Sequence, residues 1–226
     1  MKRISSGNAN LDRILNGGFP ADAIHIVMGS PGTGKTILAE QLAFENASRE
    51  RPALYLTTFS EPLPKFITFL QEYAFADPSR IGTDVIYENL GESLADGPER
   101  LSGRVAELLQ EYRPRVLVID SFKAIADLMP DLGAWRRQLY ELAGLLSAYS
   151  ATSFWVGEYT VYMSAHLPEF AVADGIVELR REQHGARDFR FLRVVKLRGS
   201  RFLDGLHALR ITKQGLELSP RLVTPF

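Results

Sequence analysis

An eight-residue loop near the start of the chain constrains the fold more than any other segment. Residues 29–36 read Gly-Ser-Pro-Gly-Thr-Gly-Lys-Thr and match the pattern G-x-x-x-x-G-K-T. An apolar run, residues 23–28, precedes the loop, and a helix-like pattern begins at Ile37. Backbone N–H groups of such a loop can point together at an anion where a helix begins. The pattern and its flanks therefore predict a phosphate-binding loop between a strand and a helix, rather than an ordinary glycine-rich turn.

The residue types in this loop also indicate the ligand. Lys35 can reach the outer phosphates as a point charge, and the Thr36 hydroxyl can ligate a magnesium ion that bridges them. We therefore expect a nucleoside triphosphate with Mg²⁺. The residues expected to contact it are Ser30, Pro31, Gly32, Thr33, Gly34, Lys35, Thr36 and Ile37.

Strand-like apolar runs alternate with segments of helical period along most of the chain. The predicted strands are residues 23–28, 53–58, 84–88, 115–119 and 153–157. The predicted helices are residues 35–49, 98–112 and 131–149, and the apolar stripe of the last runs from Leu132 through Trp135 to Tyr149. Such alternation is typical of a mainly parallel sheet covered by helices.

After Asp174 the pattern changes to a period of two. The segments concerned are residues 176–180, 190–197, 207–212 and 216–218, separated by glycine-containing turns. They predict an antiparallel C-terminal edge to the sheet. The expected fold is therefore α/β, with a mainly parallel central sheet, flanking helices and an antiparallel C-terminal β edge.

Length and composition favour one domain over two. With 226 residues and 46% apolar content, the chain can bury one large core. We expect a single domain over residues 1–226, with residues 1–22 packed on the core. Residues 219–226 are expected to form a tail or a truncated linker to a further domain.

Charge and cysteine usage narrow the partners. The formal net charge is −1, from 26 basic and 27 acidic residues, so no global field would attract nucleic acid or anionic lipid. The absence of cysteine suits a reducing compartment. No signal-peptide pattern and no run of about 18 apolar residues occurs, so we expect a soluble, cytoplasmic protein without a membrane segment.

Two carboxylates are candidates for the chemistry around the phosphates. Asp120 closes the apolar run 115–119, and a carboxylate at the end of such a strand can hold Mg²⁺ beside the loop. Alone it would more often be a turn or cap residue; paired with the loop, it is the second predicted metal residue after Thr36. Glu61, after the predicted strand 53–58, is a candidate for orienting the attacking water, or it favours the positive end of a helix that begins at Pro62.

A pair of cations stands near the C-terminus. Lys196 and Arg198 are two residues apart in a predicted strand, so their side chains face the same way, and Gly199 allows an immediate turn. They can neutralise charge on a transferring phosphoryl group, as arginine fingers do. Without context, such a pair is more often a solvated strand face.

Together, several segments resemble a KaiC-type ATPase domain of the RecA superfamily. They are residues 7–12 and 17–20, the loop 29–36, the strand ending at Asp120, Val156-Gly157-Glu158, residues 173–176 and Lys196-Leu197-Arg198-Gly199-Ser200. The resemblance covers nearly the whole chain and implies a RecA-like P-loop fold, an ATPase activity with Mg²⁺ and a role in circadian-clock-like signalling with an unknown partner protein.

The resemblance also implies how the site is completed. In that family the K-x-R-G pair acts across a subunit boundary of a hexameric ring. By resemblance, Lys196 and Arg198 act on the ATP of a neighbouring copy, and Leu197, Ser200 and Thr212 contact that nucleotide. One departure concerns hydrolysis: the family generally has two adjacent glutamates after the second strand, whereas this chain has Ser60-Glu61. We therefore expect slow turnover of ATP to ADP.

Three alternatives remain open from sequence. The first is autophosphorylation of a Ser or Thr, as in the clock relatives. The second is an ATP-dependent scaffold without turnover, which Ser60 suggests. The third is a RecA- or RadA-like recombinase, but residues 158–174 and 127–134 contain no Lys or Arg, which argues against nucleic acid as a partner.

Histidines and aromatics add little to the predicted site. The four histidines have no metal-ligand spacing, and His25 is expected to have a structural role in a core strand. Trp155, Tyr159 and Tyr162 are most simply interpreted as packing residues, with adenine stacking as the alternative.

Overall fold

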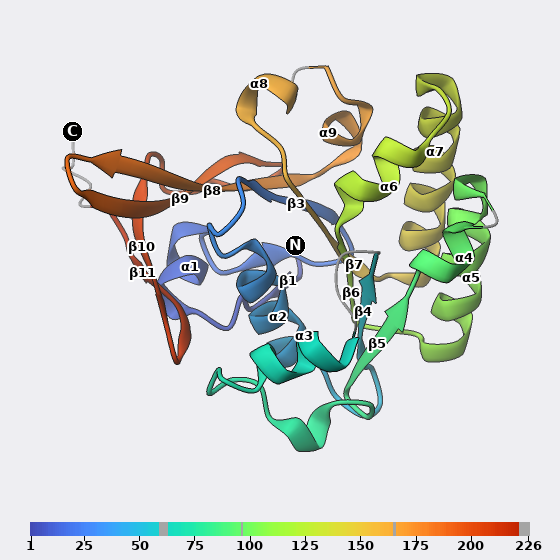
Figure 1. The fold of residues 1–226 in the computed structure, drawn as a ribbon, viewed down its shortest axis with the longest axis horizontal. Coiled ribbons are helices and arrows are strands. Elements are labelled where there is room, and N and C mark those ends of the chain that lie inside the picture. Colours follow the sequence, from blue (N-terminus) through green and yellow to red (C-terminus); the bar gives the residue numbers. More distant parts are fainter. Residues whose placement is uncertain (59–62, 96, 165, 222–226) are drawn as a thin grey trace.

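A large, mostly parallel sheet organises the protein (Figure 1). The structure is a computed structural model that describes residues 1–58, 63–95, 97–164 and 166–221. The strands of the sheet are β3 (Ile24–Gly29), β4 (Ala53–Thr57), β5 (Val85–Asn89), β6 (Val116–Asp120), β7 (Thr152–Gly157), β8 (Gly175–His184), β9 (Arg187–Leu197), β10 (His207–Thr212) and β11 (Gly215–Ser219). In the described residues their spatial order is β11-β10-β9-β8-β3-β7-β6-β4-β5.

The sheet has a parallel and an antiparallel part. The strands from β8 to β5 pair in parallel, and β9, β10 and β11 continue the sheet in antiparallel fashion. Parallel pairing brings the carboxyl ends of β3, β4, β6 and β7 to one edge, where ligands bind in open α/β sheets. This arrangement confirms the predicted α/β class, the parallel centre and the antiparallel C-terminal edge.

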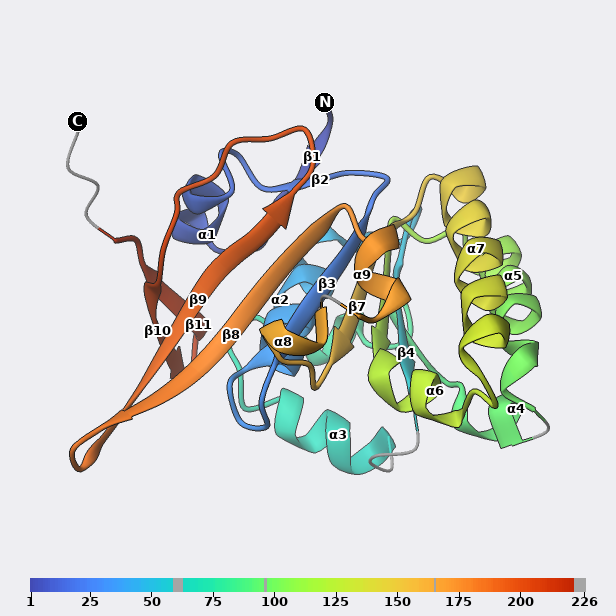
Figure 2. The ribbon, with the colours of Figure 1, turned by 90° about the horizontal axis from the view of Figure 1, so that it is seen from above.

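Helices cover both faces of the sheet (Figure 2). On one face lie α2 (Lys35–Asn46) and α3 (Leu63–Leu70), and on the other lie α5 (Leu101–Tyr112), α6 (Phe122–Leu128) and α7 (Leu132–Tyr149). The short elements are α1 (Ala9–Ile14), α4 (Gly91–Ala95), α8 (Val161–Ser164), α9 (Pro168–Val172), the 3₁₀ turns η1 (Pro78–Arg80) and η2 (Pro98–Arg100), and the two-stranded β1 (Arg3–Ile4) and β2 (Phe19–Pro20). None of the helices in the described part of the chain combines the length and apolar character needed to cross a bilayer.

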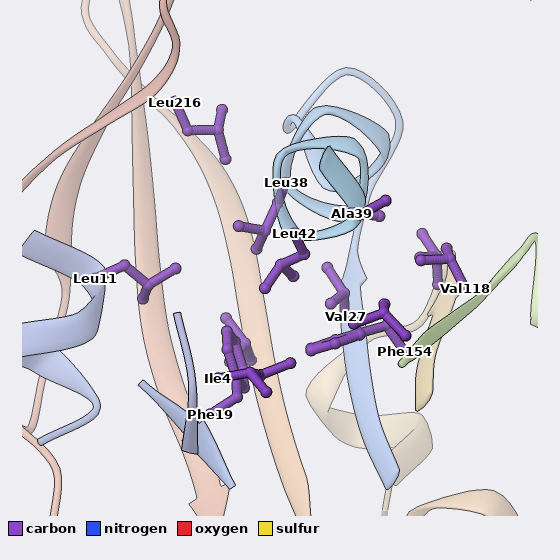
Figure 3. Close-up of a cluster of buried hydrophobic side chains, with 14 of the residues drawn as sticks. Ile4, Leu11, Phe19, Val27, Leu38, Ala39, Leu42, Val118, Phe154 and Leu216 are labelled. Atoms are coloured by element: carbon purple, nitrogen blue, oxygen red, sulfur yellow. The ribbon is translucent and has the colours of Figure 1, made fainter. Parts of the chain in front are cut away.

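Continuous apolar strands explain why both faces are covered. In β6, Val116 and Val118 belong to the hydrophobic cluster under α2, whereas Leu117 and Ile119 belong to the cluster under α5 and α7. Because successive side chains of a strand point to opposite faces, a strand that is apolar at every position must be buried on both sides. Figure 3 shows the first cluster, where Leu38 and Leu42 of α2 pack over the sheet.

The first twenty residues pack against this cluster. Leu11, Ile14 and Phe19 are fully buried in it. Two side-chain amides attach the segment to β11: Asn8 donates to the carbonyl of Leu216 and Asn10 to that of Leu218, each at 2.6 Å. Asn8 also caps α1, since its side chain accepts from the backbone of Asn10 and Leu11. The segment is therefore an integral layer beside the antiparallel edge.

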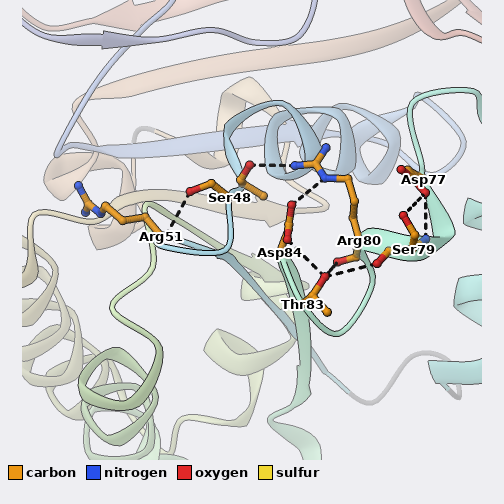
Figure 4. Close-up of polar contacts among 8 residues, drawn as sticks. Ser48, Arg51, Asp77, Ser79, Arg80, Thr83 and Asp84 are labelled. Atoms are coloured by element: carbon orange, nitrogen blue, oxygen red, sulfur yellow. Dashed lines mark hydrogen bonds and ion pairs between the residues drawn. The ribbon is translucent and has the colours of Figure 1, made fainter.

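Polar contacts hold the connection between α3 and β5 (Figure 4). Asp77 caps η1 by accepting from the backbone N–H of Ser79 at 2.9 Å and from its hydroxyl at 2.7 Å. Arg80 pairs with Asp84 at 3.0 Å and donates to the carbonyl of Ala47 at 2.8 Å. The connection is thereby attached to the end of α2.

The predicted strands agree well with the observed ones, with one difference at the antiparallel edge. All five predicted parallel strands match to within one residue at either end. The predicted segments 176–180 and 190–197, however, are parts of one long hairpin, because the pairing of β8 with β9 continues to His184–Arg187 through residues 181–188, which have no large apolar side chain. Polar residues on both faces carry no alternating pattern, so sequence could not reveal this extension.

Two residues expected to pack in the core are exposed. Leu132 is 47% exposed in the first turn of α7, although Trp135 and Leu139 on the same stripe are buried. Tyr162 is 90% exposed on α8, so the packing prediction is wrong for it, whereas Trp155 and Tyr159 are buried as predicted.

His25 is a buried structural residue. Its Nε2 donates to the carbonyl of Pro20 at 2.8 Å, and its ring stacks on Phe154. Burial, partly opposed by the hydrogen bond to Pro20 and by Asp174, lowers the pKa of His25 to about 4. The neutral ring therefore stabilises the fold fully above the unfolded pKa, and this stability is lost as pH falls from the unfolded value through about 4.

We predict that the wild type loses about 2 to 3 kcal/mol more of its free energy of unfolding than His25→Gln when pH falls from about 7.5 to about 4.5. The reason is that His25 is neutral in the folded wild type at this pH, whereas the exposed ring of the unfolded chain binds a proton, which favours unfolding. The amide side chain of His25→Gln binds no proton in either state. Urea unfolding curves of both proteins at the two pH values measure the difference. Equal losses in the two proteins would contradict the assignment.

Candidate nucleotide-binding site

The loop of residues 30–34 connects β3 to α2 at the carboxyl edge of the sheet. Gly29, the last residue of β3, pairs with Leu179 of β8, and a Cβ on Gly29 would lie 2.2 Å from the carbonyl oxygen of Leu179. Only glycine fits such a close approach of two strands. Gly32 has a positive φ of 71°, which turns the chain back towards α2. The predicted loop context of strand, turn and helix is present.

The backbone of the loop is available to an anion. Among the described residues, the backbone N–H groups of Gly32 and Gly34 donate to no other backbone group. The first N–H groups of α2 have no intrahelical partner either, as at any helix start. The loop is braced from within, because the Thr33 hydroxyl donates to the carbonyl of Ser30 at 2.8 Å. Free donors on a braced turn at a helix N-terminus form an anion-binding arrangement.

Lys35 lies across the same loop. Its ammonium group donates to the carbonyl of Ser30 at 2.9 Å. Burial lowers the pKa of Lys35, and the nearby carboxylates of Glu158 and Asp120 partly oppose that shift. A cation held this way by a single carbonyl can turn to a phosphate with little loss.

Thr36 and Asp120 meet as the sequence predicts. The Thr36 hydroxyl donates to Oδ2 of Asp120 at 2.8 Å, and the hydroxyl of Tyr55 donates to the same oxygen at 3.0 Å. Asp120 ends β6 while Tyr55 lies on the neighbouring β4, so parallel pairing brings them together. Hydroxyl and carboxylate oxygens are the ligands that Mg²⁺ prefers. In nucleotide sites it usually binds through one or two carboxylates together with the phosphates. The residues present therefore fit this ion.

Burial affects the pKa of Asp120, the predicted metal residue. It raises the pKa of Asp120, while the hydrogen bonds from Thr36 and Tyr55 and the charge of Lys35 pull it down. Glu158, which follows β7, raises the pKa of Asp120 further. A buried carboxylate whose charge is incompletely compensated is prepared to accept a cation.

The cation pair lies at the other end of the sheet. In β3 and β8, which are parallel, His25 pairs with Gly175 at one end and Gly29 with Leu179 at the other. Lys196 pairs with Ile176, and the backbone N–H of Arg198 donates to the carbonyl of Asp174. Along the strands, Lys196 is therefore about 10 Å and Arg198 about 16 Å from the end of β3, where the loop of its own chain begins.

Both cations have local partners at that end. Lys196 donates to the carbonyl of Phe170 at 3.3 Å, and burial followed by repulsion from Arg198 lowers its pKa. Arg198 donates to Oδ1 of Asp174 at 2.9 Å and is 62% exposed. Asp174 thus holds the exposed guanidinium at the surface.

The remaining predicted contacts divide between the two ends. Leu197 is buried in the core, and the Ser200 hydroxyl accepts from Arg3 near the cation pair. Thr212 instead follows Ile211, whose Cδ1 would lie 3.4 Å from a Cβ on Gly34. Thr212 therefore belongs to the end of the sheet that carries the loop of its own chain. Glu61 and its neighbour Ser60 lie outside the described residues.

Three residues near the loop were missed by sequence reasoning. Glu158 follows the carboxyl end of β7, and the rule that pointed to Asp120 could have found it. Tyr55 and Arg190 could not be found in this way, because each reaches the site from a strand distant in sequence: Arg190 of β9 donates to the carbonyl of Gly32 at 3.1 Å. No local pattern marks such a contact.

Comparisons with known proteins give a consistent result. The chain is 27% identical over 223 residues to the circadian clock oscillator protein KaiC of Picosynechococcus, with 93% of this chain and 43% of that protein covered. It is 25% identical over 243 residues to a UPF0273 protein of Methanopyrus kandleri, with 99% and 94% covered. The chain thus spans less than half the length of the clock proteins it is similar to.

A solved structure has the same fold. The KaiC-like protein of the hyperthermophilic archaeon Pyrococcus horikoshii matches with a TM-score of 0.83 at 20% identity, covering 97% of this chain and 99% of that one. The family model for the KaiC ATPase matches residues 4–223. The phosphate-type loop, the Thr36–Asp120 pair and the cation pair all lie within this match, and the chain therefore belongs to the KaiC family of ATPases.

Proposed function

We propose that the protein binds ATP with Mg²⁺ at the loop 29–36 and hydrolyses it slowly. The observation that carries this proposal is the set of free backbone N–H groups beside Lys35 and the Thr36–Asp120 pair. Backbone donors and the ammonium group bind the polyphosphate, while Ile37 follows directly at the start of α2. Thr36 and Asp120 would hold Mg²⁺, which neutralises phosphate charge when bound.

Hydrolysis requires a water in line with the bond that breaks. We propose that Glu61 orients this water and accepts its proton as the oxygen attacks the γ-phosphorus. The bond to the bridging oxygen breaks, and ADP leaves with the bonding electron pair. Lys35 counters the charge that develops on the phosphoryl oxygens.

We further propose that Lys196 and Arg198 act on the nucleotide of a neighbouring copy. Their position towards the opposite end of β8 from the loop of their own chain supports this arrangement. A contact between two different surfaces of identical chains closes into a ring when the rotation permits. The proposed assembly is a hexameric ring, by likeness to the clock relatives, and its proposed role is clock-like signalling or regulation.

The presence of Ser60 beside Glu61 favours a second candidate function. If Glu61 alone orients water poorly, the protein binds ATP to assemble and turns it over too slowly to matter. A measurement of steady phosphate release by the purified protein distinguishes the slow ATPase from this scaffold.

Lys35→Ala is predicted to weaken binding of Mg-ATP by about 100-fold, because the variant loses a charge-assisted contact to phosphate. Isothermal titration calorimetry measures the change. Lys2→Ala is the matched control, since Lys2 is an exposed lysine of the first residues, and it should bind like the wild type. Unchanged affinity in Lys35→Ala would contradict the assignment of the loop.

A mixture of two inactive variants is predicted to recover turnover. Lys35→Ala removes the binding site, and Arg198→Ala removes the charge donated to the neighbour. In randomly mixed rings with equal amounts of each, about one quarter of the interfaces join an intact loop to an intact Arg198. Phosphate release should return to about one quarter of the wild-type rate. A mixture as inactive as its components, although native mass spectrometry shows mixed rings, would contradict action across the interface.

Ser60→Glu is predicted to raise kcat for ATP by about tenfold, because it restores the second carboxylate that the family generally has. Ser60→Gln is the control for side-chain size and should stay near the wild-type rate. Steady-state phosphate release measures both variants. An unchanged kcat in Ser60→Glu would show that Ser60 does not limit turnover.

A further inference from the structure

Arg190 contacts the phosphate loop of its own chain from a strand of the antiparallel edge. Its Nε donates to the carbonyl of Gly32 at 3.1 Å, across 158 positions of sequence. We propose that Arg190 is a positioning residue that holds this carbonyl outward, so that the N–H of Thr33 faces the bound phosphate. This inference rests on the proposed binding of ATP at the loop.

Arg190 projects from a well-anchored strand. Leu192, two residues further along β9, is fully buried in the cluster under α2, and side chains two apart share a face. Arg190 also pairs with Leu209 of β10 and with Arg181 of β8. The guanidinium therefore starts from a fixed point on the α2 side of the sheet.

The same hairpin touches the loop at two places. At the beginning of the loop, Gly29 is held in the ladder with Leu179 of β8. Further along, Gly32 is held by Arg190 of β9. Between them, no backbone hydrogen bond of the described residues joins the loop to this hairpin. The hairpin thus braces the outer side of the loop while the Thr33 hydroxyl braces its inner side.

The planar peptide bond transmits the effect of Arg190. In a trans peptide the carbonyl and the following N–H point in opposite directions. If the carbonyl of Gly32 is held outward, the N–H of Thr33 must point inward. Gly32 needs such a restraint, because its φ is 71° and a Cβ there would meet nothing within 4 Å, so this peptide plane can rotate at little cost.

The charges around Arg190 indicate that it acts as a hydrogen-bond donor rather than through its positive charge. Arg181 forms an ion pair with Asp188, and the hydrogen bond from Arg181 lowers the pKa of Asp188, with Arg190 adding to the effect. Asp188 therefore offsets part of the charge of Arg190. The feature specific to Arg190 is therefore its Nε–H group, which lies within hydrogen-bond distance of the Gly32 carbonyl.

Two substitutions separate donor from charge. In Arg190→Gln, the amide nitrogen takes the place of Nε and can donate without carrying charge; in Arg190→Met, the donor and the charge are both lost. We expect Arg190→Gln to bind Mg-ATP and Mg-ADP within about twofold of the wild type, and Arg190→Met to bind both about tenfold more weakly. Because the change concerns the loop and not the transfer step, kcat at saturating ATP should stay within about twofold for both variants.

Calorimetry with Mg-ATP and Mg-ADP, together with steady-state phosphate release, tests the proposal. Arg187→Met, an exposed arginine on the same hairpin, is the control for loss of charge and should bind like the wild type. Equal weakening in Arg190→Gln and Arg190→Met would overturn positioning in favour of charge or stacking. Wild-type affinity in Arg190→Met would overturn any role at the loop. Failure of the wild type itself to bind would instead refute the proposed function.

Discussion

The pairing of β3 with β7 on one side and β8 on the other is the constraint on which the rest depends. It fixes Gly29 so closely against Leu179 that the chain must leave the sheet there as a tight turn and enter α2. The same parallel pairing brings the ends of β6 and β4 to this edge, so Asp120 and Tyr55 converge on Thr36. The order and parallel pairing of the strands therefore place the oxygens of Asp120, Tyr55 and Thr36 beside the backbone N–H groups of the loop.

Burial then determines the electrostatics of this edge. Asp120 is buried beside one lysine, and its compensation is incomplete while Glu158 adds a further negative charge. Burial therefore disfavours the ionised form of Asp120 unless a cation binds beside it. The neighbouring loop, in contrast, offers hydrogen-bond donors to an anion. A nucleotide with its metal satisfies both needs at once, which is why the two halves are best understood as one site.

Much of this could be predicted from sequence, for reasons visible in particular residues. Strands β3 and β6 are continuous apolar runs apart from His25 and the closing Asp120, because both faces are covered, and that pattern is local. The loop and Asp120 follow from motif and strand end. The contact of Arg190 with Gly32 and the distance of Lys196 from the loop depend on strand order, which no local pattern encodes. Leu132 is exposed although it continues the apolar stripe of α7, and Tyr162 is exposed although it closely follows a buried strand, because a local pattern does not reveal what packs against each residue.

A structure determined with Mg²⁺ and a non-hydrolysable ATP analogue tests the central claim most directly. We expect the phosphates on the N–H groups of residues 32–36, the metal beside Thr36 and Asp120, and Lys196 and Arg198 of an adjacent copy facing the γ-phosphate. A nucleotide bound elsewhere, or a loop left empty at saturating analogue, would contradict it.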